Sequence, residues 1–240
     1  PTQYSMTKQQ SYHDYMDAVN TGDTDTAQRL LDDFAKDAGY NYRGVHRSFS
    51  EFTVFDREKI GSNAGTRLGD GFYVTLEFKD EATARYADES YGKNRMDLYV
   101  KMESPLVLGT PFDENFVNKM EEDFSEFGWF GEDSFSTYAV TPEKIKKIFQ
   151  SNDGYEQMET IRLIANRNSM EISELLKQYG FDSVIDENDY VKQAVVFDET
   201  QLKSAEPVTY DEYGDVIMPY ERFNQDNMDI RYSLSKAEKD

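Results

Sequence analysis

The chain has 240 residues, enough for one large domain or two small ones, and carries a formal net charge of −21. It contains no cysteine and two histidines, which excludes disulfide frameworks, thiolate catalysis, cysteine zinc sites and multi-histidine metal sites. Because its Lys and Arg are scattered among Asp and Glu, duplex nucleic acid is a poor partner, and a basic protein partner is mildly favoured.

Residues 1–39 predict a helical hairpin. Apolar residues recur at i, i+3, i+4 and i+7 in 12–19 and again in 27–34, with "TGD" between them and Gly39 as a stop. His13 lies off the apolar stripe, so we expect it in solvent.

The period then changes to short β-branched or aromatic runs, which predict strands at 41–45, 51–55, 71–78 and 96–102. A Gly-rich loop at 57–71 separates the second run from the third. Residues 79–90 predict a helix, and 104–112, with two prolines, is expected to leave the strand register.

Residues 112–180 lean helical. Thr141 and Pro142 fit an N-cap and first helical position, and Asn168 with Glu171 fits a capping box. Strands follow at 182–186 and 193–198, and then an irregular tail from about Ser204. Helices, strands, helices and strands in that order favour an α+β fold over a wound βαβ sheet.

Common nucleotide and metal motifs do not fit. The loop "GSNAGTRLGDG" lacks the Walker A ending and precedes a strand, so it is not a dinucleotide fingerprint. Acidic pairs carry little signal among 47 Asp and Glu residues, and we predict no metal site. No apolar run approaches the ~20 residues of a membrane span and no signal peptide is evident, so we expect a cytoplasmic protein without membrane association.

A combination of short segments carries more information. The segments are "YRGV", "GDGFYVT", "ATARYAD", "YGFDSVID" and "QAVVFDETQLKSA … DIRYSL". Together they resemble the ADP-ribosyltransferase domains of phage polyvalent proteins, which are related to the poly(ADP-ribose) polymerase and diphtheria-toxin branch. The resemblance runs from about Tyr40 to Leu234 and is most specific in its closing part.

The resemblance implies a fold and its parts. The expected architecture is a split β-sandwich of two small antiparallel sheets around an NAD cleft, with an inserted helical segment. The helical hairpin at 1–39 would pack on a main domain at 40–234, and 235–240 would be a linker or tail.

The implied function is a toxin- or effector-like mono-ADP-ribosyltransferase. It would use NAD as co-substrate, release nicotinamide and modify an acceptor, expected to be a host protein in the host cytoplasm. Two alternatives stay open: a catalytically weak or silent module that binds NAD, ADP-ribose or a protein, and a structural role within a larger phage-derived protein.

The resemblance also implies site residues. Arg43 stands where the family's His-Tyr-Glu set has histidine, as in the arginine-serine-glutamate branch, and a guanidinium suits the NAD pyrophosphate. Gly44 matches the residue whose backbone holds the nicotinamide carboxamide. Tyr73 matches the tyrosine that stacks on the nicotinamide ring. Further cofactor-binding residues are expected on the "GFYVT" strand and the helix after it, namely Gly71, Phe72, Thr75, Thr83 and Tyr86.

Gln193 departs from the family, because it occupies the place of the glutamate that stabilises the oxocarbenium-like transition state. A neutral amide accepts a ribose hydrogen bond but supplies no full negative charge. Three explanations stay open: a natural variant with altered activity, an introduced isosteric substitution, or a nearby carboxylate, Asp189 or Glu187, in its role. Val191 stands where arginine-modifying members have a second glutamate, which makes an arginine acceptor less expected. The remaining histidine, His46, is expected on the surface or in a loop.

Overall fold

The computed structural model describes all residues except 1, 61–66, 126–141, 188–190, 225 and 232–240. The strands are β1 (Tyr42–Ser48), β2 (Phe72–Phe78), β3 (Asn94–Val100), β4 (Pro105–Leu108), β5 (Ser183–Glu187), β6 (Val191–Val196) and β7 (Leu202–Ser204). The α-helices are α1 (Thr2–Thr21), α2 (Thr24–Asp37), α3 (Glu81–Tyr91), α4 (Glu114–Ser125), α5 (Pro142–Phe149), α6 (Gly154–Arg167), α7 (Ile172–Gln178) and α8 (Pro219–Arg222). Short 3₁₀ turns lie at Arg57–Lys59 and Glu199–Gln201.

The strands of the described residues form one mixed sheet in the order β4-β5-β6-β2-β1-β3-β7, in which β4–β5 is the parallel pair. The fold is therefore α+β as predicted, but the strand pairing gives one sheet where two small antiparallel sheets were expected. The join between β2 and β1 is narrow, since the backbones of these two strands pair at one position, Val45↔Thr75. The neighbouring β1–β3 ladder runs from Tyr42↔Val100 to Ser48↔Asn94.

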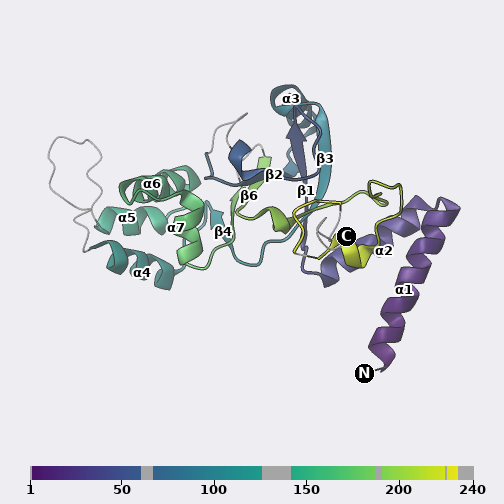
Figure 1. Ribbon diagram of the computed structural model, residues 1–240. Coiled ribbons are helices and arrows are strands. Elements are labelled where there is room, and N and C mark those ends of the chain that lie inside the picture. Colours follow the sequence, from purple (N-terminus) through teal and green to yellow (C-terminus); the bar gives the residue numbers. More distant parts are fainter. Residues whose placement is uncertain (1, 61–66, 126–141, 188–190, 225, 232–240) are drawn as a thin grey trace.

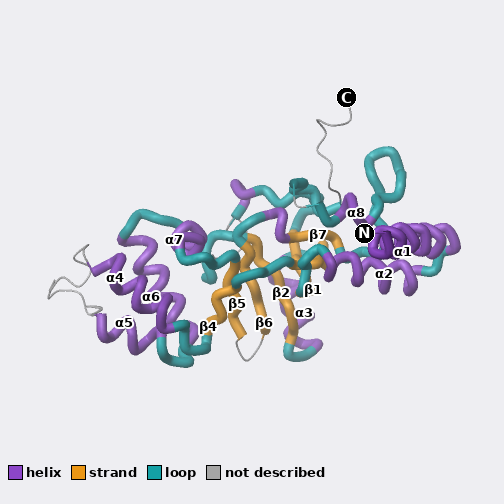
Figure 2. The backbone as a smooth tube through the Cα atoms, turned by 90° about the horizontal axis from the view of Figure 1, so that it is seen from below, coloured by secondary structure: helices purple, strands orange, loops and turns teal. Residues whose placement is uncertain are grey.

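Two groups of helices lie at opposite ends of the sheet. Figures 1 and 2 show α4–α7 gathered beside β4 and the α1–α2 hairpin beside the β7 end. The helix α3 connects β2 to β3 and packs on β1 and β2. Within the described residues, no helix is long and apolar enough to cross a bilayer.

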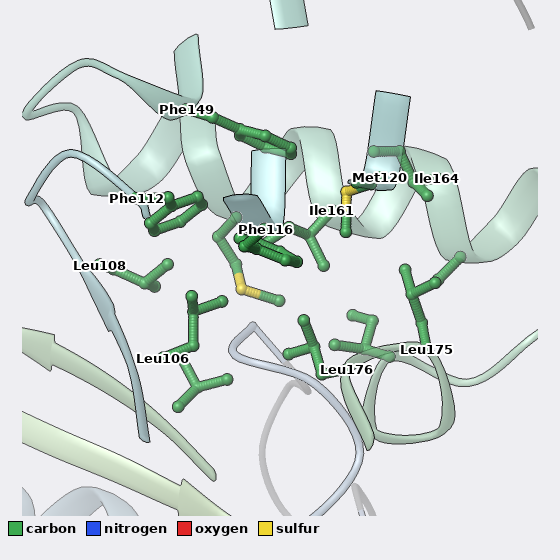
Figure 3. Close-up of a cluster of buried hydrophobic side chains, with 14 of the residues drawn as sticks. Leu106, Leu108, Phe112, Phe116, Met120, Phe149, Ile161, Ile164, Leu175 and Leu176 are labelled. Carbon is green, nitrogen blue, oxygen red and sulfur yellow. The ribbon is translucent and has the colours of Figure 1, made fainter. Parts of the chain in front are cut away.

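Each helical group has its own apolar core. Figure 3 shows the core under α4–α7, where Phe112, Phe116 and Phe149 meet aliphatic side chains from the helices and from β4. The α1–α2 hairpin buries Tyr15 and Leu31 against Tyr99 of β3 and Phe223. A third core, centred on Phe72 and Leu98, covers the sheet on its other face.

The register explains how these cores share the sheet, because side chains alternate between faces along a strand. Val184 and Val195 are cross-strand partners, and both belong to the core under α4–α7. Tyr99, partnered with Arg43, contributes to the core under the hairpin. Since the register places all four residues on one face, the two helical groups cover different parts of that face and leave a strip between them.

Two predicted segments differ from the structure. Residues 51–55 form no strand, only an isolated bridge at Val54 to Asp229, and the segment instead packs Phe55 against Phe72 with ring centroids 5.2 Å apart. Residues 105–108 do form a strand, β4. Pro105 is tolerated there because it is the first residue of the strand, where a missing N–H costs little.

A third difference concerns the capping box predicted at residues 168–171. Asn168 ends α6, and α7 begins only at Ile172 after Glu171, whose side chain makes no cap hydrogen bond. The predicted N-cap at Thr141 lies outside the described residues.

Candidate active site

A row of mostly polar side chains crosses the strip between the two helical groups. Successive cross-strand pairs join Asp186 to Gln193, Gln193 to Thr75, Thr75 to Val45 and Val45 to Asp97. Directly opposite residues point to the same face, so all five side chains lie on the face that carries both helical groups. This row, called the central row below, holds two of the sequence-predicted site residues, Gln193 and Thr75.

A pocket of about 470 Å³ lies at one end of the central row, beside Val45 and Asp97. It is lined by Gln28, Arg43, Gly44, Val45, Leu76, Asp97, Ala205, Glu206 and Pro207. The lining comes from α2, β1, β2, β3 and the segment after β7, and it includes two predicted cofactor-binding residues, Arg43 and Gly44.

Gly44 allows the two strands to approach closely beside this pocket. A Cβ at this position would lie 3.1 Å from the carbonyl oxygen of Thr75 and 3.3 Å from Cβ of Val74. A side chain would therefore press against β2, whereas glycine lets the two strands pack closely here.

Arg43 is the cation of the pocket and is half exposed, with three neighbours that fix its guanidinium. It lies 4.9 Å over the ring of Tyr99, it donates to the carbonyl oxygen of Ala205 at 3.1 Å, and its Nη1 lies 3.7 Å from Oδ1 of Asp32. The buried Arg222 donates to the carbonyl oxygen of Glu206 from behind. Two arginines thus fix the 205–206 wall of the pocket.

The hairpin reaches the same place through Asp32. The hydroxyl of Tyr99 donates to Asp32 and accepts a 2.8 Å hydrogen bond from Nε2 of Gln28. Burial, reinforced by the bond to Asp32, raises the pKa of Tyr99 well above its usual value, so it stays a neutral donor. Asp32 therefore interacts with both Arg43 and Tyr99.

Tyr73 lies on the same face as the central row but on the side of α4–α7. Its hydroxyl donates to the carbonyl oxygen of Gly69 at 3.0 Å and accepts from the amide of Leu68 at 2.8 Å. Burial raises its pKa to about 12. Because the hydroxyl is used to hold the loop before β2, only the ring remains to meet a ligand.

The other residues predicted on β2 lie apart from the pocket. Gly71 permits close contact with β6, since a Cβ there would lie 2.5 Å from the carbonyl oxygen of Val196. Phe72 is buried in the core on the opposite face. Thr75 is the one predicted β2 residue in the central row.

The two predicted residues of α3 are not among the pocket lining. Thr83 is bonded through its amide and hydroxyl to the helix-capping carboxylate of Asp80, at 2.8 Å each. Tyr86 is 66% exposed. The structure therefore brings Arg43 and Gly44 together at the pocket and places Tyr73, Thr83 and Tyr86 elsewhere.

The carboxylates near Gln193 lie on different faces of the sheet. Asp189 lies outside the described residues. Glu187 pairs with Lys192 in register and by an ion pair, on the face opposite to Gln193. Asp186, which the sequence reasoning missed, is Gln193's partner on the same face, is 6% exposed and is ion-paired with Arg67. The segment "DSVIDEN" contains Asp186, but only the strand register shows which acid faces Gln193.

His46 was expected on the surface or in a loop, and this prediction is wrong. It lies within β1, half-buried, with Nδ1 2.8 Å from the carbonyl oxygen of Tyr73 and its ring 4.9 Å from that of Phe55. Burial lowers its pKa. His13 is exposed and lies 3.1 Å from Asp17, as expected. In the described part of the chain, no three His, Cys, Asp or Glu residues are grouped as metal ligands would be.

Comparison with known proteins now names the class. The family model "ADP-Ribosyltransferase in polyvalent proteins" matches residues 42–208, from the first residue of β1 to just past β7. This is more than half of the chain, and the chain belongs to that family. No curated protein and no solved structure gives a significant match.

Proposed function

We propose that the protein binds NAD in the pocket lined by Arg43 and Gly44 of β1 and transfers ADP-ribose from it to an acceptor, with release of nicotinamide. The family supports ADP-ribosyl transfer in general. The observation that carries the NAD site is the pocket of about 470 Å³ lined by Arg43 and Gly44. In this proposal the NAD cleft that was expected between two sheets corresponds to this pocket.

The residues present fit such a ligand. Arg43 offers a planar guanidinium to a pyrophosphate, and a guanidinium binds phosphate oxygens in pairs. Gly44 lines the same pocket and, by having no Cβ, lets β1 pack closely against β2 beside it. Gln193 and Thr75 lie farther along the central row, where they offer an amide and a hydroxyl to ribose hydroxyls.

The acceptor is proposed to be a protein with a basic surface. The net charge of −21 favours encounter with a basic partner and disfavours a nucleic-acid backbone. The β5–β6 end of the site, which includes Val191, is proposed to face the acceptor. Val191 offers no second carboxylate there, which argues against an arginine as the modified residue.

The test is incubation of the folded chain with NAD labelled in its adenylate part, with and without host lysate. We expect release of nicotinamide and transfer of label to protein, and we expect Arg43→Ala to abolish both while the fold stays intact. Tyr210→Ala, which removes an exposed ring that does not line the pocket, is the control. A folded chain with no nicotinamide release and no thermal shift at millimolar NAD would contradict the proposal.

A second candidate is a module of the same fold that binds NAD or ADP-ribose without turnover. Gln193 favours it, because an amide lacks the charge that promotes nicotinamide departure. Calorimetry separates the two candidates: saturable NAD binding with no nicotinamide release over long incubation would support the binding module alone.

A further inference from the structure

We propose that Asp186 supplies the negative charge that Gln193 lacks, so that two residues on adjacent strands share the work of one glutamate. The inference rests on the proposed function. Gln193 would bond the ribose of the bound NAD, and the carboxylate of Asp186 beside it would stabilise the positive charge that develops on that ribose.

The register carries this assignment. Asp186 and Gln193 are directly paired across β5 and β6, so their Cβ atoms lie roughly 5 Å apart on one face. Glu187 is turned to the other face, where Lys192 neutralises it. Among the described neighbours of Gln193 on its own face, Asp186 is the cross-strand carboxylate and Thr75 is the partner on the other side.

The surroundings of Asp186 screen its carboxylate little. Its side chain is only 9% exposed, and it forms an ion pair with Arg67. Arg67 is itself 43% exposed, so water screens the cation more than the anion. A charge in poorly solvated surroundings acts more strongly on a nearby developing charge than the same charge in water.

The chemical step balances without any further reagent. The bond between the ribose C1′ and the nicotinamide nitrogen breaks, and its electron pair leaves with neutral nicotinamide. A nucleophilic oxygen or nitrogen of the acceptor, or water, forms the new bond to C1′ and loses one proton to solvent. Asp186 forms no covalent bond in this step.

The first experiment compares nicotinamide release by the unaltered chain, Asp186→Asn, and a matched control, Glu199→Gln. Glu199 is also mostly buried and lies 3.5 Å from an arginine, Arg57, but is not part of the pocket lining or the central row. We expect Asp186→Asn to lower kcat by about 100-fold and Glu199→Gln to leave it nearly unchanged. KM for NAD should change by less than about threefold, as for a group that acts on the transition state.

Rescue separates an electrostatic role from a structural one. Adding Gln193→Glu to Asp186→Asn restores the carboxylate from the adjacent strand, and we expect most of the lost kcat to return. A variant damaged only in folding would not recover in this way. The inference would be overturned if Asp186→Asn had the same kcat as the unaltered chain. It would also be overturned if Glu187→Gln lowered kcat as much as is expected for Asp186→Asn.

A second measurement leaves Asp186 in place, in case its substitution prevents folding. If Asp186 already supplies the charge, Gln193→Glu alone should raise kcat by less than about tenfold. No release by the unaltered chain but strong release by Gln193→Glu would overturn the inference while the NAD site stands. Absence of release and of NAD binding in both would overturn the proposed function itself.

Discussion

Arg43 is held by an internal anion that competes with any phosphate. Asp32 lies 3.7 Å from its guanidinium, and both side chains are about half exposed, at 45% and 50%. An exposed ion pair is worth only about 0.2–1 kcal/mol, so a pyrophosphate can displace Asp32. The same carboxylate still lowers the net affinity of the pocket for an anion.

We therefore expect Asp32→Asn to tighten NAD binding by about two- to fivefold, the equivalent of such an ion pair. Asp33→Asn, a change of the same charge at an exposed neighbour on α2, should have a smaller effect. Isothermal calorimetry at 50 mM and 500 mM salt measures both. If Asp32→Asn tightened NAD binding as much at high salt as at low salt, that result would contradict the electrostatic explanation.

His46 makes stability depend on pH. Burial lowers its pKa in the folded state, so the unfolded chain binds the proton more readily, and stability rises with pH in this range. The contribution of His46 is complete above its unfolded pKa of about 6.5 and is lost as pH falls below that value toward the folded pKa.

We expect the unfolding free energy to fall between pH 7 and pH 5 by at most about 1.4 kcal/mol per pH unit from this residue. His46→Gln should flatten that slope, although it also lowers stability at pH 7 by disturbing the contact with Tyr73. His13→Gln, on the exposed face of α1, serves as the control. Urea unfolding at three pH values is the measurement, and an unchanged slope in His46→Gln would disprove the assignment.

The α2 helix is the element that joins the hairpin to the site. Its apolar residues, among them Leu31, are buried against Tyr99 and Phe223, while Gln28 on the same helix lines the pocket. Its N-terminus is fixed by Asp23, whose side chain accepts from the amide of Thr26. Packing of the helix thus sets the position of a pocket wall.

Leu31→Ala should lower the unfolding free energy by about 2–5 kcal/mol, because Leu31 is fully buried and a cavity would remain. Lys36→Ala, at an exposed position of the same helix, should change it little. Denaturant titration with fluorescence detection measures both. A loss below 1 kcal/mol for Leu31→Ala would mean that the hairpin is loosely attached.

The elements could be predicted where their signal is local. Apolar spacing gave the hairpin and the strands at 71–78 and 96–102, because periodicity needs no knowledge of the partner. Residues 51–55 are as aromatic as a strand, yet Phe52 and Phe55 serve as packing groups for His46 and Phe72. β4 was missed because its stability comes from pairing with β5, about 75 residues later in the chain.

The site was predictable to a similar extent. The resemblance led to Arg43 and Gly44, which do line one pocket. It did not lead to Asp186 or Asp32, because each comes near a predicted residue only through a nonlocal contact: the β5–β6 register brings Asp186 to Gln193, and hairpin packing brings Asp32 to Arg43. Short motifs specify which residues are present, whereas register and docking decide which of them meet.

The whole molecule carries a negative field, with a net charge of −21. Such a field speeds encounter with a basic acceptor and is screened over about 10 Å at 0.1 M salt. In the proposed reaction the chemical step on bound NAD would depend on short-range contacts and be less affected by salt.

We therefore expect transfer of label to a basic acceptor protein to fall several-fold between 50 and 300 mM salt. Nicotinamide release in the absence of acceptor should fall much less over the same range. Initial rates of both, measured on the same preparation, give the comparison. Equal salt dependence of the two rates would argue against electrostatic recruitment of the acceptor.

The narrow join between β2 and β1 has a mechanical consequence. Hydrogen-bonded ladders stiffen a sheet, and here the four strands β4, β5, β6 and β2 meet the other three through the single recorded pair Val45↔Thr75. Backbone pairing therefore resists bending least along that line. The core around Phe72 and Leu98 takes residues from both sides of the join, whereas each of the other two cores lies on one side only. Any bending there would thus be borne by this third core, and a ligand seated on the opposite face of the sheet would be coupled to it through the strands.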